Sequence, residues 1–376
     1  IAFEYEIDTA LNPDLLLSDS VGRRLPLQEL IARVEAYDSR LSVATVELDV
    51  PSGNSVEFFV RGKEDPETGK PAPLGFAQVY ADPVTGEILG SRARGGCCSR
   101  QTIVRFVHEL HYTLQGGRFW RDIMGYIAIA WMFDCFVGFY LTLPRGRPFW
   151  AKWRPAWRIK RGVNTHRFNL DLHRASGLWL WGVMFLMAFS AIELNLSQQV
   201  FRPVIGLVSP VTPTVFDTRK PGKRAIPPAF DFAAAVKIAT DDARRLGWEK
   251  PAYRAIVVER YGVYRVLFGE RLPTGLGNNS IDIDLTTGAI LDRRVPGDGS
   301  LGDILVDAQY PLHSGQIAGL PGRIFVSSMG AVLTILCITG IVIWWKKRAI
   351  RRLTRHRRKV ASAGAHLQQE SFKVAE

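Results

Sequence analysis

Cysteine and acidic residues are scarce in this chain of 376 residues, and the composition excludes two classes of protein. Four cysteines are too few for a small scaffold held together by disulfides. Only 22% of the residues are charged while 47% are hydrophobic, which excludes a disordered or collagen-like chain. Acids number 36 against 48 lysines and arginines, so the net charge is +12. A basic globular protein and a membrane protein both remain open.

Several motifs that mark well-known chemistry are also absent. No CxxCH motif occurs, which argues against covalently attached c-type haem. The run from Gly275 to Ser280 lacks the third glycine and the following helix of a dinucleotide-binding fingerprint. There is also no P-loop and no nucleophile elbow. The chain therefore carries no recognisable motif for binding a nucleotide cofactor of its own.

The positive charges are concentrated in two stretches beside apolar runs. Residues 144–172 contain eight basic residues and one acid, and residues 346–359 contain nine basic residues and no acid. Together the two stretches carry +16, which leaves −4 for the rest of the chain. Such segregation follows the positive-inside rule, so we expect a membrane protein without a nucleic-acid partner.

Three apolar stretches are long enough to cross a hydrocarbon core of ~30 Å as helices. They are Ile123 to Leu143, Ser176 to Leu196 and Ile324 to Trp345. The third ends in Trp344 and Trp345 directly before Lys346, a pattern typical of the cytoplasmic interface. Counting backwards, the loop between the first two spans is cytoplasmic, and the two long remaining segments are extracytoplasmic.

The predicted fold is an α-helical transmembrane bundle with two α+β extracytoplasmic domains. Residues 1–5 belong to no signal peptide, and we expect them to be the outer end of a first span that this sequence lacks. The natural bundle would then have four spans, of which this sequence contains three. The alternative is that the N-terminus of the chain is engineered or processed. The expected order is 6–115 extracytoplasmic domain, 119–143 span, 144–172 basic cytoplasmic loop, 173–196 span, 197–318 second extracytoplasmic domain, 322–345 span and 346–376 basic cytoplasmic tail.

The two extracytoplasmic segments read as copies of one unit. Each has a helical pattern, two alternating strands, and a strand pair around a Thr-Gly turn. The predicted elements are 25–37, 42–50, 56–61 and 76–91 in the first segment, and 230–246, 254–260, 263–270 and 280–293 in the second. The turns are Thr85-Gly86 and Thr287-Gly288, where glycine tolerates the positive φ of a tight turn.

The repeat continues past the strands to a histidine. His111 lies 25 residues after Gly86, and His313 lies 25 residues after Gly288. Each histidine follows a leucine and comes shortly before a predicted span. The duplicated unit therefore places one histidine near the outer end of two different spans.

Three further motifs give the chain a family resemblance over essentially its whole length. They are DLHRASGLWLW at 171–181, LHSGQIAG at 312–319 and TGIVIWWKKR at 339–348. With its two Thr-Gly units, the chain resembles the PepSY-associated transmembrane family of bacterial inner-membrane proteins. It is similar, more narrowly, to the ferrisiderophore reductases of that family, including those that act on hydroxamate siderophores such as ferrioxamine.

The resemblance implies a haem-containing reductase in the bacterial inner membrane with large periplasmic domains. Two b-type haems would pass electrons across the membrane to a ferric siderophore, which loses its iron as Fe(II) because hard oxygen ligands prefer the more highly charged ion. The expected partners are this siderophore, membrane lipid, and an electron donor such as a quinol or a cytoplasmic reductase. The alternatives are a non-redox PepSY protein that anchors a binding or regulatory module, and an accessory subunit of siderophore uptake.

Histidines near the span ends are the candidate haem ligands, because b-type haem takes imidazole nitrogens from different helices. At the outer face we pair His111 with His313, on the alignment of the repeat. His108, three residues before His111, is the competing ligand or a second-layer hydrogen-bond donor.

At the inner face the candidate ligand is His173. His166 lies seven residues earlier, about 10.5 Å along a helix, so the two cannot approach one iron from opposite sides. The resemblance places the partner of His173 on the absent first span, where the family usually carries a further histidine. His166 as a fallback ligand, or a five-coordinate iron, are the alternatives.

Other polar residues receive structural interpretations. Asp134 and Glu193 lie within the spans, and for Asp134 helix-to-helix hydrogen bonding is favoured over a proton path or a contact with the haem edge. Cys135 and Cys337 are expected to pack within spans, whereas Cys97 and Cys98 are either free or joined as a vicinal disulfide. Arg92, Arg94 and Arg100, taken as exposed, are expected to be solvated rather than to bind anionic ligands. No special role is expected for His166, His356 and His366 as ordinary polar residues.

Overall fold

The computed structural model describes residues 1–65 and 67–373, with side chains described as far as Thr354. The chain divides into two compact units. The first unit combines Ile1–Ile129 with Phe189–Val326, and the second combines Ala130–Ala188 with the chain from Ser327 onward. Residues 374–376 of the expected cytoplasmic tail, and the side chains of His356 and His366, lie outside the described part.

The strands of both repeats form one antiparallel sheet in the first unit, in the order β4-β3-β2-β1-β5-β6-β7-β8. The first repeat supplies β1 Leu41–Glu47, β2 Val56–Gly62, β3 Phe76–Ala81 and β4 Ile88–Ala93, and the second supplies β5 Ala252–Val258, β6 Val263–Phe268, β7 Asn279–Asp284 and β8 Ile290–Arg294. These strands confirm the predicted repeat. The two copies are joined where β1 pairs with β5, with Val46 opposite Ala255 and Glu47 opposite Arg254. The expected separate extracytoplasmic domains therefore share a single sheet.

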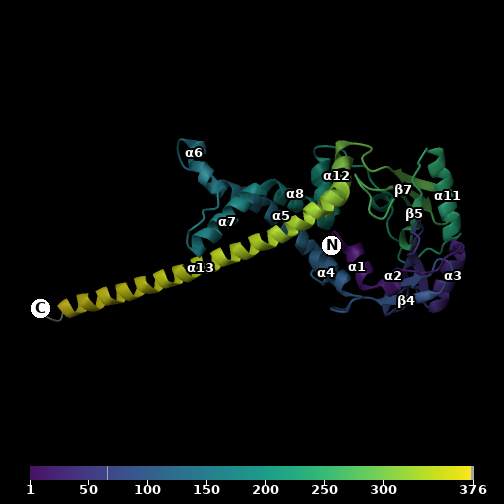
Figure 1. Cartoon of the computed structure of the whole chain (residues 1–376), viewed down its shortest axis with the longest axis horizontal. Coiled ribbons are helices and arrows are strands. Elements are labelled where there is room, and N and C mark those ends of the chain that lie inside the picture. The colour runs from purple at the N-terminus through teal and green to yellow at the C-terminus, as the bar shows by residue number, and fades with distance from the viewer. Residues whose placement is uncertain (66, 374–376) are drawn as a thin grey trace. The chain divides into compact units, whose positions relative to one another are not determined.

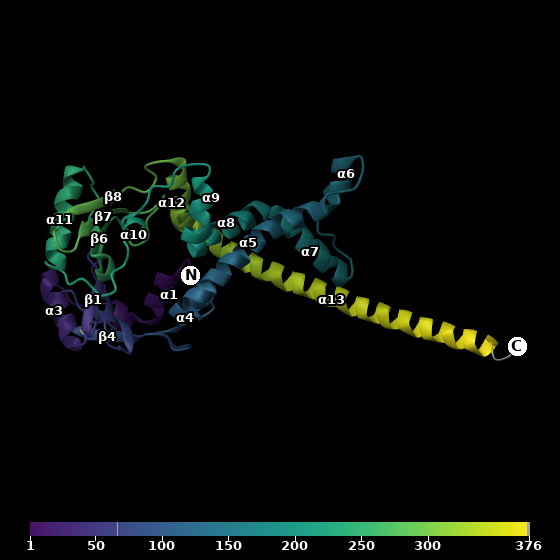
Figure 2. The ribbon, with the colours of Figure 1, turned by 180° about the vertical axis from the view of Figure 1, so that it is seen from behind.

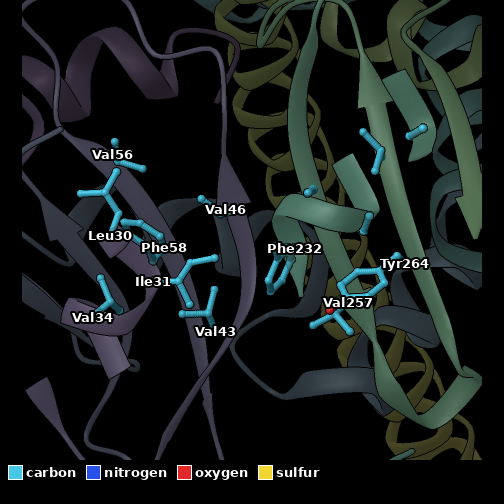
Figure 3. Close-up of a cluster of buried hydrophobic side chains, with 14 of the residues drawn as sticks. Leu30, Ile31, Val34, Val43, Val46, Val56, Phe58, Phe232, Val257 and Tyr264 are labelled. Carbon is cyan, nitrogen blue, oxygen red and sulfur yellow. The ribbon is translucent and has the colours of Figure 1, made fainter. Parts of the chain in front are cut away.

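Two amphipathic helices cover the same face of this sheet (Figures 1 and 2). They are α3 Leu27–Tyr37 and α11 Phe232–Arg245, one from each repeat. Figure 3 shows Val34 of α3 beside Phe58 of the sheet, and Phe232 beside Tyr264, all within one continuous apolar cluster. Full burial of such a side chain stabilises the fold by roughly 1.5–3 kcal/mol. The two repeats therefore share a core as well as a sheet.

The opposite face of the sheet carries ion pairs, because successive side chains of a strand point to opposite faces. Glu47 of β1 accepts a hydrogen bond of 2.6 Å from Arg254 of β5, across the junction between the repeats. Arg92 of β4 is buried and donates two bonds to Asp8, at 2.7 and 3.2 Å. The expectation of a solvated Arg92 is therefore wrong, since this guanidinium fixes helix α1 Glu4–Leu11 against the sheet.

The two Thr-Gly turns have the same construction in both repeats. The Asp82 carboxylate accepts the backbone N–H groups of residues 84 and 85, and that of Asp284 accepts those of residues 286 and 287. Gly86 and Gly288 follow with φ of 71° and 73°, a left-handed conformation that favours glycine. The predicted hairpin turns are confirmed.

Both histidine-bearing helices end before the spans begin. Helix α4 Ile103–Thr113 stops at Leu114, whose φ is 49°, and α12 Leu301–Ser314 stops at Gly315, whose φ is 80°. A Cβ at Gly315 would collide with the carbonyl oxygen of Gly322, so only glycine fits this corner. A left-handed residue thus separates each histidine helix from the membrane helix that follows it.

Within the described residues, three helices are long and apolar enough to cross a membrane: Gly117–Thr142, Trp181–Gly206 and Gln316–Thr354. The first is α5, the second comprises α8 Trp181–Leu196, η2 Ser197–Phe201 and α9 Arg202–Gly206, and the third comprises η4 Gln316–Ala318 and most of α13 Gly319–Lys373. This agrees with the expected number of spans. The second span differs from the expected 173–196, because a separate helix, α7 Thr165–Trp179, precedes it. The Asp171 carboxylate on α7 binds Arg167 and Arg174, which gives α7 a polar character that α8 lacks.

The remaining helices are short connections. They are α2 Pro13–Leu16, α6 Phe149–Trp153, η1 Arg154–Trp157, α10 Val215–Thr218 and η3 Glu259–Tyr261. In the second unit, Trp153 packs against Phe139 and Trp157, with ring centres 5.6 and 5.2 Å apart. These contacts attach the basic loop to the C-terminal half of α5.

Asp303 fixes the start of α12, the helix that bears His313. Its carboxylate accepts the backbone N–H groups of Thr212 at 2.7 Å and Ser300 at 3.0 Å. Burial alone would raise the pKa of Asp303, but these hydrogen bonds outweigh it and hold the pKa at about 2. The carboxylate therefore stabilises the fold at neutral pH.

We expect Asp303→Asn to lower the free energy of unfolding of the sheet-containing unit by about 2 kcal/mol at pH 7. Because the folded pKa lies below the unfolded value of 3.8, the wild-type advantage should persist above pH 4 and disappear as the pH falls to about 2. Urea unfolding at several pH values measures this, with the exposed Asp298→Asn as the matched control. A pH-independent difference would contradict the assignment.

Candidate functional site

Two histidines from different repeats meet in the first unit. His111 is on α4 and His313 is on α12, and their ring centres lie 6.1 Å apart with the ring planes at 52°. They come from positions 202 residues apart in the chain, which correspond in the two copies of the repeat. The structure thus brings together the pair that the sequence assigns to the outer site.

Two imidazoles bound to one metal ion have a defined distance between their ring centres. A metal–nitrogen bond of about 2.0 Å on each side, with about 1 Å from nitrogen to ring centre, places two trans imidazole centres about 6 Å apart. The observed 6.1 Å matches this value. This distance is ordinary for neighbouring aromatic rings and also suits two imidazoles on one metal ion, and His111 and His313 are the residues that would hold a haem here.

Ser190 orients His313 from a third helix. Its hydroxyl, on α8, lies 2.8 Å from Nδ1 of His313. A hydrogen bond at one ring nitrogen fixes the orientation of an imidazole and assigns metal binding to the other nitrogen. Nε2 is then the nitrogen through which His313 would bind a metal ion.

His111 and His108 have different environments, although both lie on α4. His111 is exposed to solvent along one edge of its ring. Burial of the rest of the side chain and the neighbouring His108 lower the pKa of His111, and a lower pKa favours the neutral form that metals bind. His108 instead directs Nδ1 to the Glu4 carboxylate, 2.6 Å away, and its ring contacts Tyr112. The geometry favours His111 as the ligand and gives His108 another partner.

His173, in the second unit, is oriented by the membrane helix α13. Its Nδ1 lies 3.2 Å from the carbonyl oxygen of Leu336 and 3.0 Å from the hydroxyl oxygen of Thr339. The Thr339 hydroxyl donates its own hydrogen to the same carbonyl, at 2.9 Å. Both neighbours therefore act as acceptors toward the ring, so Nδ1 carries the proton and Nε2 keeps its lone pair.

The His173 ring occupies the space beside Gly340 that a larger side chain at this position would fill. A Cβ at this position would lie 3.2 Å from Cε1 of His173, tighter than ordinary van der Waals contact. His166, the alternative inner ligand, lies at the start of the same helix α7 and is exposed. The contacts with α13 thus fix the His173 ring, whereas His166 is exposed.

Among the described residues no group of three or more His, Cys, Asp and Glu side chains is arranged to hold a metal ion. A site made entirely of protein ligands is therefore unsupported in this part of the chain. A haem needs only one or two protein ligands, because the porphyrin supplies the other four. The paired outer histidines and the single inner histidine suit the second kind of site.

The structure also places the remaining candidates. Cys97 and Cys98 form a disulfide, Cys135 is buried, and Cys337 is exposed on α13, contrary to the packing role expected for it. The Glu193 carboxylate accepts a hydrogen bond of 2.7 Å from Ser197, one turn along its helix. Asp134 is exposed on α5. Arg100 is exposed but binds Asp14 with both guanidinium nitrogens, so it joins two segments of the first unit.

Three residues that hold the candidate ligands escaped the sequence-based reasoning. They are Ser190, Thr339 and Gly340. Ser190 is a polar residue in an apolar run, and the other two open the TGIVIWWKKR motif. Those signals were visible, but only the fold shows which histidine each residue contacts.

A family model described as the PepSY-associated TM region matches residues 1–347. No curated protein matches the chain.

Proposed function

Because the chain belongs to the PepSY-associated transmembrane family, we propose that it is a haem-containing reductase of the bacterial inner membrane that passes electrons to ferric siderophores in the periplasm. The observation that carries the proposal is the approach of His111 to His313, with ring centres 6.1 Å apart. A family model that covers nearly the whole chain supports the membrane location, and the three candidate spans agree with it.

The protein's part in this function is to hold and tune two cofactors. His111 and His313 would bind an outer haem b, and His173 would bind an inner one. When bound, haem supplies one-electron transfer. Ser190 would fix the orientation of one outer ligand, and Thr339 that of the inner ligand. Hydrogen bonds of this kind also raise the basicity of the bound imidazole.

We infer from the family resemblance that the second ligand of the inner haem is a histidine of another membrane helix. Two alternatives are His166 and a five-coordinate iron. His166 is the weaker candidate because its place on the same helix as His173 prevents approach from the opposite side.

The electron donor and the acceptor are separate molecules. A quinol or a cytoplasmic reductase would supply electrons, since the sequence has no nucleotide-binding motif. The acceptor would be a ferric siderophore, of the hydroxamate type by family resemblance. Its iron is released after reduction because hard oxygen ligands bind Fe(II) more weakly than Fe(III).

We expect His111→Ala and His313→Ala each to remove the outer haem signal and ferric-siderophore reduction while leaving expression intact, because each removes an axial ligand. His173→Ala should empty the inner site instead. Haem-to-protein ratios and visible spectra of the purified protein, followed by anaerobic reduction and addition of ferric siderophore, measure these effects. His166→Ala tests the alternative inner ligand, which gains support if the inner spectrum changes.

Full haem occupancy and normal turnover in both outer variants would reject the outer pair. A colourless wild-type protein would favour the non-redox binding or regulatory protein. Tight association with a permease, without intrinsic reduction, would favour the accessory subunit.

Gly340→Val should lower the inner haem content, because a branched side chain would displace the His173 ring. Gly330→Val is the matched control, since it lies on the same helix and a Cβ there meets no atom within 4 Å. The haem-to-protein ratio is measured for both variants. Equal inner haem content in the two would show that the position of His173 is unimportant.

Ser190→Ala should weaken outer haem binding by about 10- to 100-fold, the usual effect of losing a hydrogen bond to a metal-bound histidine. Haem titration of the haem-depleted protein measures this change. Ser190→Thr keeps the hydroxyl and should retain most of the affinity. If alanine binds haem as tightly as serine does, the Ser190 contact does not orient the ligand.

A further inference from the structure

The loop after the first candidate span carries positive charge that no acid balances. Residues 144–161 contain seven basic residues and neither aspartate nor glutamate. They are Arg145, Arg147, Lys152, Arg154, Arg158, Lys160 and Arg161. All seven are exposed, and none forms an ion pair or a side-chain hydrogen bond with another described residue. The next two arginines differ, because Arg167 and Arg174 both bind the buried Asp171. The charge of residues 144–161 is therefore available to an anion.

The short helices α6 and η1 of this loop are fixed by contacts with two longer helices. Trp153 is buried, and its indole N–H donates a hydrogen bond of 3.2 Å to the hydroxyl of Thr142 at the end of α5. The same tryptophan shares an apolar cluster with Leu178 of α7. Arg174 of α7 donates to the carbonyl oxygen of Pro155, at 3.0 Å. Both α5 and α7 therefore hold α6 and η1 in place.

The free side of α6 and η1 forms a hollow of about 420 Å³. The hollow is lined by three tryptophans and two arginines, which are Trp150, Trp153, Trp157, Arg154 and Arg158. The ring centre of Trp153 lies 5.5 Å from that of Trp150 and 5.2 Å from that of Trp157, so the aromatic wall is continuous. Among the described residues, no acid lines the hollow. Its volume lies in the ~300–1,000 Å³ range of sites for small molecules.

We propose that this hollow binds the headgroup of an anionic phospholipid. Arg154 and Arg158 contact the phosphate, since a guanidinium group matches the geometry of phosphate oxygens. The tryptophans contact the glycerol and the first carbons of the acyl chains. Because α5 ends at Thr142 and α6 begins at Phe149, the hollow directly follows a candidate span, where headgroups lie. This inference goes beyond the proposed function and is independent of haem.

Exposed apolar surface favours a lipid over a free phosphate ion. The exposed fraction is 73% for Trp150, which lines the hollow, and 39% for its neighbour Phe149. Contact with a lipid would remove this apolar surface from water, which is favourable. A phosphate ion would neutralise the arginines but leave both rings exposed. The binding energy available to a lipid is therefore larger.

The uncompensated positive charge selects among phospholipids. A zwitterionic headgroup carries an ammonium group beside its phosphate, and the basic residues of the loop repel that group. An anionic headgroup brings only negative charge to the same residues. We therefore expect phosphatidylglycerol to bind more tightly than phosphatidylethanolamine.

The test measures lipid binding to the purified full chain in a neutral detergent by native mass spectrometry. The probe is dioleoyl phosphatidylglycerol, and dioleoyl phosphatidylethanolamine, with the same acyl chains, is the zwitterionic comparison. Arg154→Gln combined with Arg158→Gln should weaken phosphatidylglycerol binding by about 30-fold, about fivefold for each charge lost. Trp150→Ala should weaken it by about three- to tenfold, whereas Trp150→Phe keeps an aromatic ring and should lose less. All three positions are exposed or line only the hollow, so the fold is retained.

The matched control is Lys160→Gln combined with Arg161→Gln, which removes the same charge from the same loop outside the hollow. It should weaken phosphatidylglycerol binding much less than the arginine pair does. Equal losses in the two double variants would mean that diffuse charge attracts the lipid, which overturns the site. Equal wild-type affinity for the two lipids would overturn the selection for an anionic headgroup. If inorganic phosphate displaces the lipid and binds the wild type and Trp150→Ala equally, the hollow is a site for a free anion and the lipid assignment is wrong.

Discussion

The pairing of β1 with β5 is the constraint on which the candidate outer site depends. It joins two copies of one unit edge to edge, so that both share a sheet and an apolar core. In each copy a helix follows the last strand, α4 in the first and α12 in the second, and carries a histidine at the same place in the repeat. Joining the copies at a fixed register brings those two histidines to 6.1 Å, without any direct connection between them in the sequence.

In two candidate ligands, His313 and His173, Nδ1 forms a hydrogen bond with a neighbouring helix. In His313 the partner is a hydroxyl from α8, and in His173 it is a carbonyl and a hydroxyl from α13. In both cases a neighbouring helix fixes the ring, and Nε2 is the nitrogen that would bind a metal ion. Ordinary surface histidines need no such arrangement, so it distinguishes these two residues from His166, which is exposed at the start of α7.

A residue in the left-handed conformation separates each histidine-bearing helix from the candidate span that follows it. Leu114 and Gly315 end α4 and α12 directly after the histidine-bearing turns. A non-glycine residue in this conformation is strained, and strained positions cluster near functional sites. His111 and His313 thus lie on helices of the first unit that end before the candidate spans begin.

The sequence by itself determined the membrane class, the three spans, the repeat and the equivalence of His111 and His313, because hydropathy, charge segregation and strand alternation act over short distances along the chain. Three predictions from the sequence were wrong: separate extracytoplasmic domains, a solvated Arg92 and a packed Cys337. The local sequence pattern does not indicate which distant strands pair or whether a single side chain is buried. Only the tertiary structure decided that the two sheets join, that His108 pairs with Glu4, and that Ser190 and Thr339 orient the candidate ligands. These contacts join residues more than a hundred positions apart, and their distances follow from how whole elements pack.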